Sequence, residues 1–175
     1  MNTSHSTLLK VIHVLFWIAF IGLCIKTGAL VVSYFVSLFV NPAGAHNLYM
    51  GLDLSAVFNH SMFYYNSVMS FLIAITALKA FIAYLIVRIF LKFSLSNPFQ
   101  TELSGLFMRI SHVSVGTGIL ALLAEAFSDK IMQAGITIPI DWSGGEILFF
   151  AGVIYLLALV FKKGTELQTE NDLTV

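Results

Sequence analysis

The sequence predicts an all-α integral membrane protein: a bundle of four transmembrane helices with the N-terminus and the C-terminus in the cytoplasm. Of its 175 residues, 58% are hydrophobic and only 10% are charged, whereas about a quarter of the residues in an average soluble domain are charged. Four long apolar segments follow one another, and most Lys and Arg residues flank them on one side. The length suits one domain, so we expect residues 1–175 to form a single transmembrane domain.

The first predicted helix covers about residues 8–40, an apolar run long enough to cross a bilayer with tilt. This run is roughly twice as long as the 7–15 residues of a signal-peptide core, so we expect no cleavage after it. Residues 41–59 contain no Lys or Arg and are rich in Gly, Asn, His and Tyr, as in an external loop or a partly ordered cap. The second predicted helix covers about residues 63–92 and ends near Arg88 and Lys92.

The third predicted helix covers about residues 98–128. Asn97 is a good N-cap residue, Pro98 fits the first helical position, and Gln100 can complete a capping exchange. We expect residues 128–146 to form a second external loop because they combine charged residues with helix-breaking Gly and Pro.

The fourth predicted helix, about residues 147–163, is the shortest. We expect Gly144 and Gly145 to limit its extension backwards and Trp142 to anchor at the lipid headgroups. Two lysines followed by Gly164 are expected to close the helix, with the glycine as a C-cap. Residues 164–175 would then form a polar, acidic cytoplasmic tail.

The distribution of basic residues predicts the orientation. Only Lys130 falls on the external side, whereas the opposite side carries Lys10, Arg88, Lys92, Arg109, Lys162 and Lys163. The positive-inside rule therefore places both termini and the middle connection in the cytoplasm.

Two of the predicted helices carry small and polar residues at helical spacing along one stripe. The stripe of the third helix consists of Ser111, Ser114, Gly118, Ala121 and Glu125. The stripe of the first helix consists of Ala19, Gly22, Lys26, Ala29 and Ser33. We expect these stripes to bring the first and third helices into contact.

Lys26 and Glu125 are predicted to lie at the same depth. Lys26 is sixteen residues from Lys10 and Glu125 is sixteen residues from Arg109, which places both roughly 24 Å from the cytoplasmic flank. Ionisable groups inside a bilayer face the bundle interior and pair. We therefore expect a buried ion pair that sets the helix register, with a proton or ion pathway as the alternative.

Lys79 is predicted to lie nearer the middle of the bilayer, about 13 Å inward from Arg88 at helical rise. It has no acid at its own predicted depth. It could reach Glu125, be held by Thr76 and backbone carbonyls, or be neutral through desolvation. This residue is the best single indication of a ligand site.

Histidines suggest two weaker sites. His13 and His112 each lie three residues inward from a basic flank, and two histidines at one depth can hold a haem. His46, Asp53 and His60 recur at intervals of seven residues. That interval corresponds to about 10.5 Å along a helix, so only a folded loop could bring these three side chains together as metal ligands.

The sequence contains no recognisable catalytic motif. A nucleophile elbow, a phosphate loop, an HExxH motif and a CxxC motif are all absent, and Cys24 is the only cysteine. The formal net charge is zero, which does not favour a nucleic-acid surface. We therefore expect a protein that is not an enzyme, holds no cofactor or metal, and makes no direct contact with nucleic acid.

The end of the chain resembles a known family. Residues 161–175, which read FKKGTELQTENDLTV, together with Asn97-Pro98-Phe99, resemble a family of small bacterial four-helix membrane proteins named domain of unknown function 2975. The resemblance implies a multi-pass protein of the bacterial inner membrane. Because members of the family are frequently accompanied by small helix-turn-helix regulators, it also implies a regulatory link, but no known activity.

The sequence and the resemblance together favour a membrane-bound regulator or sensor whose cytoplasmic tail contacts a soluble partner, with a small DNA-binding regulator as the candidate. The residues expected to make this contact are Glu166, Leu167, Gln168, Glu170, Asp172 and Leu173. One alternative is a small transporter or channel component that uses Lys26, Lys79 and Glu125. Another is a haem or quinone redox protein. The lipid bilayer would surround the chain, and a second copy of the chain is a further candidate partner.

Overall fold

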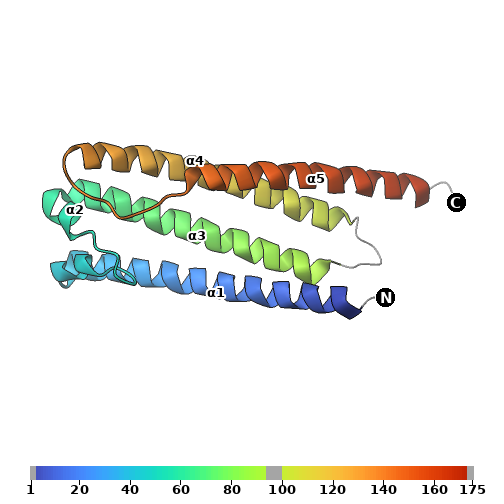
Figure 1. Ribbon diagram of the computed structural model, residues 1–175, viewed down its shortest axis with the longest axis horizontal. Helices are drawn as coiled ribbons and strands as arrows, with labels where there is room; N and C mark the ends of the chain where they lie inside the picture. Colours follow the sequence, from blue (N-terminus) through green and yellow to red (C-terminus); the bar gives the residue numbers. More distant parts are fainter. Residues whose placement is uncertain (1–2, 94–99, 173–175) are drawn as a thin grey trace.

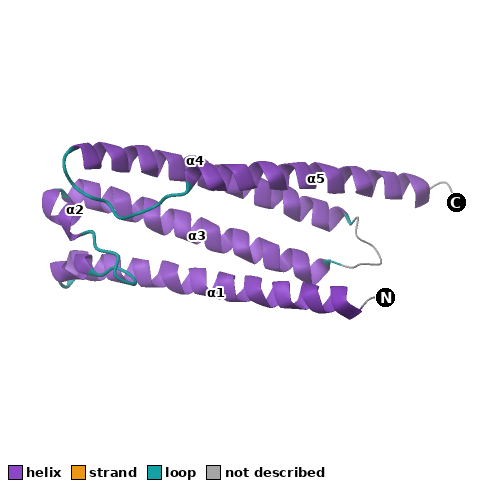
Figure 2. Ribbon diagram, in the orientation of Figure 1, coloured by secondary structure: helices purple, strands orange, loops and turns teal. Residues whose placement is uncertain are grey.

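Long, uninterrupted apolar stretches form the helices of the computed structural model, which describes residues 3–93 and 100–172 (Figure 1). The long helices are α1 (Thr3–Phe39), α3 (Met62–Lys92), α4 (Thr101–Gln133) and α5 (Gly144–Asp172). Two short helices, η1 (Pro42–His46) and α2 (Ser55–His60), lie between α1 and α3. Figure 2 shows only helices and loops in these residues. All four long helices are long and apolar enough to cross a bilayer, so the chain is an all-α, multi-pass membrane protein.

The helices pack in the order of the chain. The most extensive interface joins α4 to α5, and smaller ones join α1 to α3 and α3 to α4. Figure 1 shows α3 between α1 and the α4–α5 pair, with the start of α1 and the end of α5 at the same end of the bundle. Within the described residues, α1 makes no backbone contact with α4. The predicted contact between the first and third helices is therefore wrong.

The segment between α1 and α3 is folded into a cap. Asn41 begins η1 by accepting a hydrogen bond from the backbone amide of Ala43 at 2.9 Å. Leu48, Leu54 and Val57 bury their side chains beneath this segment. The cap therefore has an apolar core of its own, which is continuous with the core between the long helices.

Close packing explains why α5 begins earlier than the sequence predicts. A Cβ atom on Gly144 would lie 2.8 Å from Cδ2 of Leu122 on α4. Gly144 is the first residue of α5, so the helix extends back to this glycine and no further, and the absence of a side chain there permits a close approach to α4. A Cβ atom on Gly118 would likewise lie 2.7 Å from the side chain of Leu148.

The other end of α5 also differs from the prediction. The helix continues through Gly164 to Asp172, and Gly164 lacks the positive φ of a C-cap glycine. The expected C-cap is therefore wrong, and the acidic tail is the last part of α5. At the start of α4, Gln100 takes the N-cap position, whereas Asn97-Pro98-Phe99 lies outside the described residues.

The connection between α4 and α5 folds back along the bundle. Helix α4 ends at Gln133, but α5 starts beside Leu122. At helical rise, Leu122 lies roughly 16 Å back along α4 from its end. Figure 1 shows this connection crossing over α3 before α5 begins. Non-helical backbone at membrane depth requires cover from protein or a water-filled cavity. Ile138 and Trp142 of this connection are buried by protein, and residues 139–142 line a cavity.

Trp142 anchors this connection in the interior. Its indole Nε1 donates a hydrogen bond to Oγ of Ser128 at 2.9 Å, and its ring packs edge-on against Phe71. The side chain is only 4% exposed. The prediction that Trp142 sits at the lipid headgroups is therefore wrong, because the connection carries it back between α3 and α4.

Candidate functional site

A cavity of about 350 Å³ lies where α1, α3, the α1–α3 connection and the α4–α5 connection meet. Helix α1 contributes Leu23 and Lys26, and α3 contributes Leu72, Ile75, Thr76 and Lys79. The connections contribute Tyr49, Met50, Leu52, Pro139, Ile140, Asp141 and Trp142. The lining thus combines charged groups with aliphatic and aromatic side chains, which is the usual character of a ligand site.

Lys26 and Lys79 share this cavity. In the part of the chain that the structure describes, neither ammonium group takes part in an ion pair or a side-chain hydrogen bond. Asp141 lines the same cavity, and within the described residues no ion pair joins it to either lysine. Two cationic groups therefore face one small space at membrane depth.

Glu125 does not take part in this arrangement. It is exposed on α4 and lies in a neighbouring groove with Asp141 and Glu146. Because α1 and α4 do not touch, the predicted ion pair between Lys26 and Glu125 is wrong. Equal depth along two helices did not make these residues neighbours.

Asp141 is the site residue that sequence reasoning missed. Its Oδ1 accepts hydrogen bonds from the backbone amide and the hydroxyl of Ser143, at 2.9 and 3.2 Å, just before α5 begins. The sequence placed Asp141 in an external loop and left Lys79 without an acid at its own depth. The only available signal was an acid two residues before a serine at a helix start.

Thr76 does not hold Lys79, although its side chain lines the cavity. Its hydroxyl donates to the backbone carbonyl of Leu72 at 2.7 Å, one turn earlier in the same helix. Across the cavity, a tight turn is closed by hydrogen bonds between Leu48 and Leu52 and between Leu52 and Tyr49. This turn holds Met50 at φ 47°, a left-handed conformation that is unusual for a side chain other than glycine.

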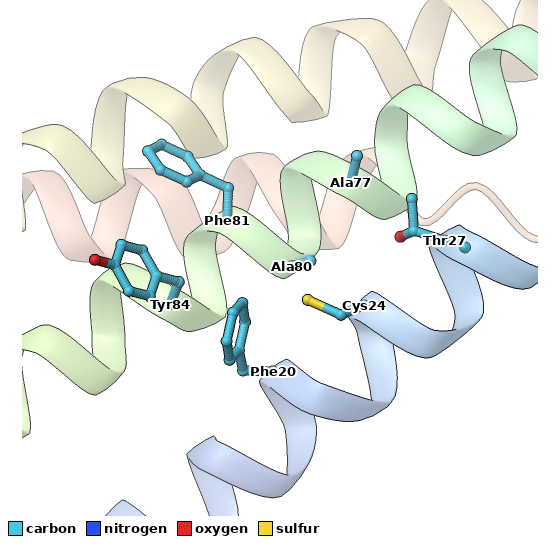
Figure 3. A pocket seen from close by; sticks show the side chains of 8 residues that line it. Phe20, Cys24, Thr27, Ala77, Ala80, Phe81 and Tyr84 are labelled. Atoms are coloured by element: carbon cyan, nitrogen blue, oxygen red, sulfur yellow. The ribbon is translucent and has the colours of Figure 1, made fainter. Parts of the chain in front are cut away.

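An apolar groove lies on the other side of the contact between α1 and α3. Its volume is about 470 Å³, and its lining consists of Phe20, Cys24, Thr27, Gly28, Ala77, Ala80, Phe81 and Tyr84. Figure 3 shows the Cys24 thiol directed into this groove beside Phe20 and Ala80. The lining suits the hydrocarbon chains of lipid.

The two histidines of the haem alternative lie on helices that do not touch. His13 on α1 stacks on Phe90 and accepts a hydrogen bond from the indole of Trp17 at 3.0 Å. His112 is exposed on α4. The structure therefore does not bring them together as two ligands of one haem.

The weak metal candidates are only partly assembled in the cap. Nδ1 of His46 lies 3.5 Å from Oδ2 of Asp53, whereas His60 stacks on Tyr64. Side-chain and backbone hydrogen bonds from Ser55, together with the nearby His46, lower the pKa of Asp53. Among the described residues, no three His, Cys, Asp or Glu side chains are grouped closely enough to hold a metal.

The predicted partner-contacting residues, apart from Leu173, lie along the last turns of α5. Glu166 pairs with Lys163 at 3.2 Å, and Leu167 is half exposed. Glu166 and Glu170 line a groove beside the start of α4. Gln168 is partly buried on the same helix. The side chain of Asp172 and all of Leu173 lie outside what the structure describes.

Comparisons with protein-family models, with curated proteins and with solved structures find no match for this chain. The fold itself defines the class: a multi-pass membrane protein built from four long helices, with a polar cavity at one end. The resemblance to the bacterial family stays a prediction, and so does the choice of membrane.

Proposed function

We propose that this protein is a membrane-bound sensor or regulator that detects a ligand in the polar cavity and responds by changing how its cytoplasmic tail is presented. One observation carries the proposal: α5 is a single helix of 29 residues that starts at the cavity wall and includes the tail. At helical rise its length is about 43 Å, enough to cross the bilayer.

The start of α5 couples the cavity to the helix. Asp141 and Trp142 line the cavity, and Asp141 is hydrogen-bonded to Ser143 immediately before the helix begins. A ligand that moves this segment also moves the first turn of α5. Since a helix is stiff, a displacement of 1–2 Å at one end is carried to the other, about the size of helix shifts in known switches.

Any shift of α5 takes place against α4. Among the described helices, α5 makes backbone contacts with α4 alone, and the buried residues of α5 are small: Gly144, Ala151 and Ala158. Small side chains interlock less than large ones, so two packings of α5 on α4 can be close in free energy. A ligand selects one of them only if it binds the two unequally.

The ends of the molecule fit this direction of signalling. Lys92 ends α3 and Lys163 lies in the last third of α5, toward the end of the bundle that holds the start of α1 and the end of α5. The positive-inside rule then puts the cavity outside and the tail in the cytoplasm. A soluble protein with a basic surface suits the acidic last turns of α5, and the resemblance suggests a small helix-turn-helix regulator.

The test is crosslinking and pull-down from native membranes. The full chain is compared with a chain that ends at Gly164, with Glu166→Gln, and with Glu146→Gln as a matched control at the other end of α5. We expect the full chain and the control to recover the same soluble partner. Truncation should abolish its recovery, and Glu166→Gln should reduce it, because a charge-assisted contact is lost.

Two results would contradict the proposal. The first is recovery of the same soluble proteins by all four chains, which would mean that the tail is not the docking surface. The second is recovery of no soluble protein by any of them, which would favour a function within the membrane.

A further inference from the structure

We propose that the cavity formed by Lys26 and Lys79 binds an amphipathic oxyanion, that is, a phosphate or carboxylate group attached to an apolar body. This inference rests on the proposed sensor function, because it names the chemical class of the ligand that the sensor would detect. The binding itself can be tested without the tail.

The charges in the cavity are unbalanced. Lys26 and Lys79 supply two ammonium groups, and Asp141 is the only acid among the described lining residues. One oxygen of Asp141 already accepts two hydrogen bonds from Ser143. Withdrawing an ammonium group from water is unfavourable unless a counter-charge is supplied. An anion between the two lysines would supply it and would receive charge-assisted hydrogen bonds.

The rest of the lining calls for an apolar body. Leu23, Leu72 and Ile75 come from α1 and α3, and Ile140 and Trp142 come from the connection before α5. The cavity volume of about 350 Å³ lies at the small end of the usual range for ligand sites. The head group of an anionic lipid and a small soluble amphiphile share this chemistry, so the experiment has to separate them.

Trp142 provides a direct reporter of binding. The chain contains two tryptophans, so Trp17→Phe leaves Trp142 as the only one. This variant is placed in nanodiscs of phosphatidylcholine, and its emission is followed while one probe at a time is added. The probes are phosphatidylglycerol within the disc, soluble dihexanoyl phosphatidic acid, inorganic phosphate, and neutral dihexanoyl phosphatidylcholine.

We expect a saturable change in emission with at least one of the two amphipathic anions. A response to phosphatidylglycerol alone identifies a lipid, and a response to phosphatidic acid added from solution identifies a soluble amphiphile as sufficient. An equal response to neutral phosphatidylcholine would show that binding does not require an anionic group. An equal affinity for inorganic phosphate would show that binding does not require an apolar body. No response to any probe would overturn the site.

Charge variants in the same background provide the decisive comparison. Lys26→Met and Lys79→Met should each weaken binding about tenfold or more, since each removes a charge-assisted hydrogen bond. Asp141→Asn should leave binding unchanged or tighten it, because it removes a competing negative charge. Lys130→Met is the matched control, since Lys130 is exposed on α4 and does not line the cavity.

Equal affinities in Lys26→Met, Lys79→Met and Lys130→Met would overturn the proposal. If Lys79→Met is not recovered as a folded protein, Lys79→Arg, which retains the charge, must retain binding.

Failure of this inference is distinguishable from failure of the sensor function. Binding that never alters recovery of a tail partner would refute the sensor and leave the anion site intact. Recovery that depends on the tail without any response of Trp142 would refute the anion site alone.

Discussion

Ser111 and Ser114 lie on the same stripe of α4 but differ in their hydrogen bonding. Ser111 donates to the backbone carbonyl of Ala151 on α5 at 3.0 Å. The hydroxyl of Ser114 is buried and has no partner among the described residues. A buried hydroxyl without a partner lowers stability, whereas a hydrogen bond between two helices raises it.

Alanine at these two positions should therefore have opposite effects. We expect Ser111→Ala to lower the free energy of unfolding by about 1 kcal/mol, because the hydrogen bond between α4 and α5 is lost. Ser114→Ala should leave that free energy unchanged or raise it slightly. Reversible unfolding in mixed detergent micelles measures both. Equal losses in the two variants would show that Ser114 has a partner in the folded protein.

Asp141 has two structural roles. One of its oxygens orders the backbone before α5, and its side chain lines both the cavity and the neighbouring acidic groove. Lys79 shares a cavity with this acid only because the connection between α4 and α5 runs back along the bundle. An acid that lines a cavity between helices can thus come from a connection as well as from a neighbouring helix.

At the scale of the elements, the pair α4 and α5 is held by small residues on both helices. The buried positions Gly144, Ala151 and Ala158 recur every seven residues along α5. Gly144 packs against Leu122 of α4, and the carbonyl of Ala151 accepts a hydrogen bond from Ser111 on the α4 stripe. A repeat of seven keeps one seam of a helix against its partner. The stripe of α1 is used differently, since Ala19 and Gly22 are exposed.

Gly118→Ala should loosen this pair. The added methyl group would lie 2.7 Å from the side chain of Leu148 and 3.2 Å from its backbone nitrogen, so we expect a loss of about 1–3 kcal/mol in the free energy of unfolding. Gly116 is the matched control on the same helix, because a Cβ atom there meets nothing within 4 Å. Gly116→Ala should be neutral or stabilising by up to about 1 kcal/mol.

Unfolding of both variants in mixed micelles tests this prediction. A stability of Gly118→Ala equal to that of Gly116→Ala would mean that Leu148 moves aside without loss. The interface would then be less tightly packed than the distances indicate.

At the scale of the whole molecule, both chain ends lie at one end of the bundle and the cap lies at the other (Figure 1). The structure places the two ends of the molecule relative to each other, and the positive-inside rule supplies the direction. The structure also identifies suitable positions for a test, since Asn59 on α2 and Lys163 on α5 are both exposed.

Cysteine labelling in intact cells tests the orientation. Cys24→Ser provides a cysteine-free background, because Cys24 is the only cysteine, and Asn59→Cys or Lys163→Cys is then added. We expect a membrane-impermeant thiol reagent to label position 59 and not position 163, since the cap faces outward and the tail inward. Labelling at position 163 without labelling at position 59 would reverse the topology and place the cavity in the cytoplasm.

The sequence by itself determined the class of fold and the approximate extent of each spanning helix. Composition establishes the membrane environment, because burial in lipid requires long apolar runs. Counting residues along a helix also gives the depth of a charge, since every residue adds the same rise. These properties depend on neighbouring residues in the chain, and they can be read without knowing which helices touch.

Only the tertiary structure decided which residues meet. Lys26 faces Lys79 and Asp141, and not Glu125, because α3 separates α1 from α4 and because the connection before α5 turns back into the bundle. Gly164 lies within α5, although isolated glycines usually favour helix ends. The physical reason is the same in these cases: contacts between remote segments outweigh local preferences, and depth along a helix says nothing about its direction around the axis.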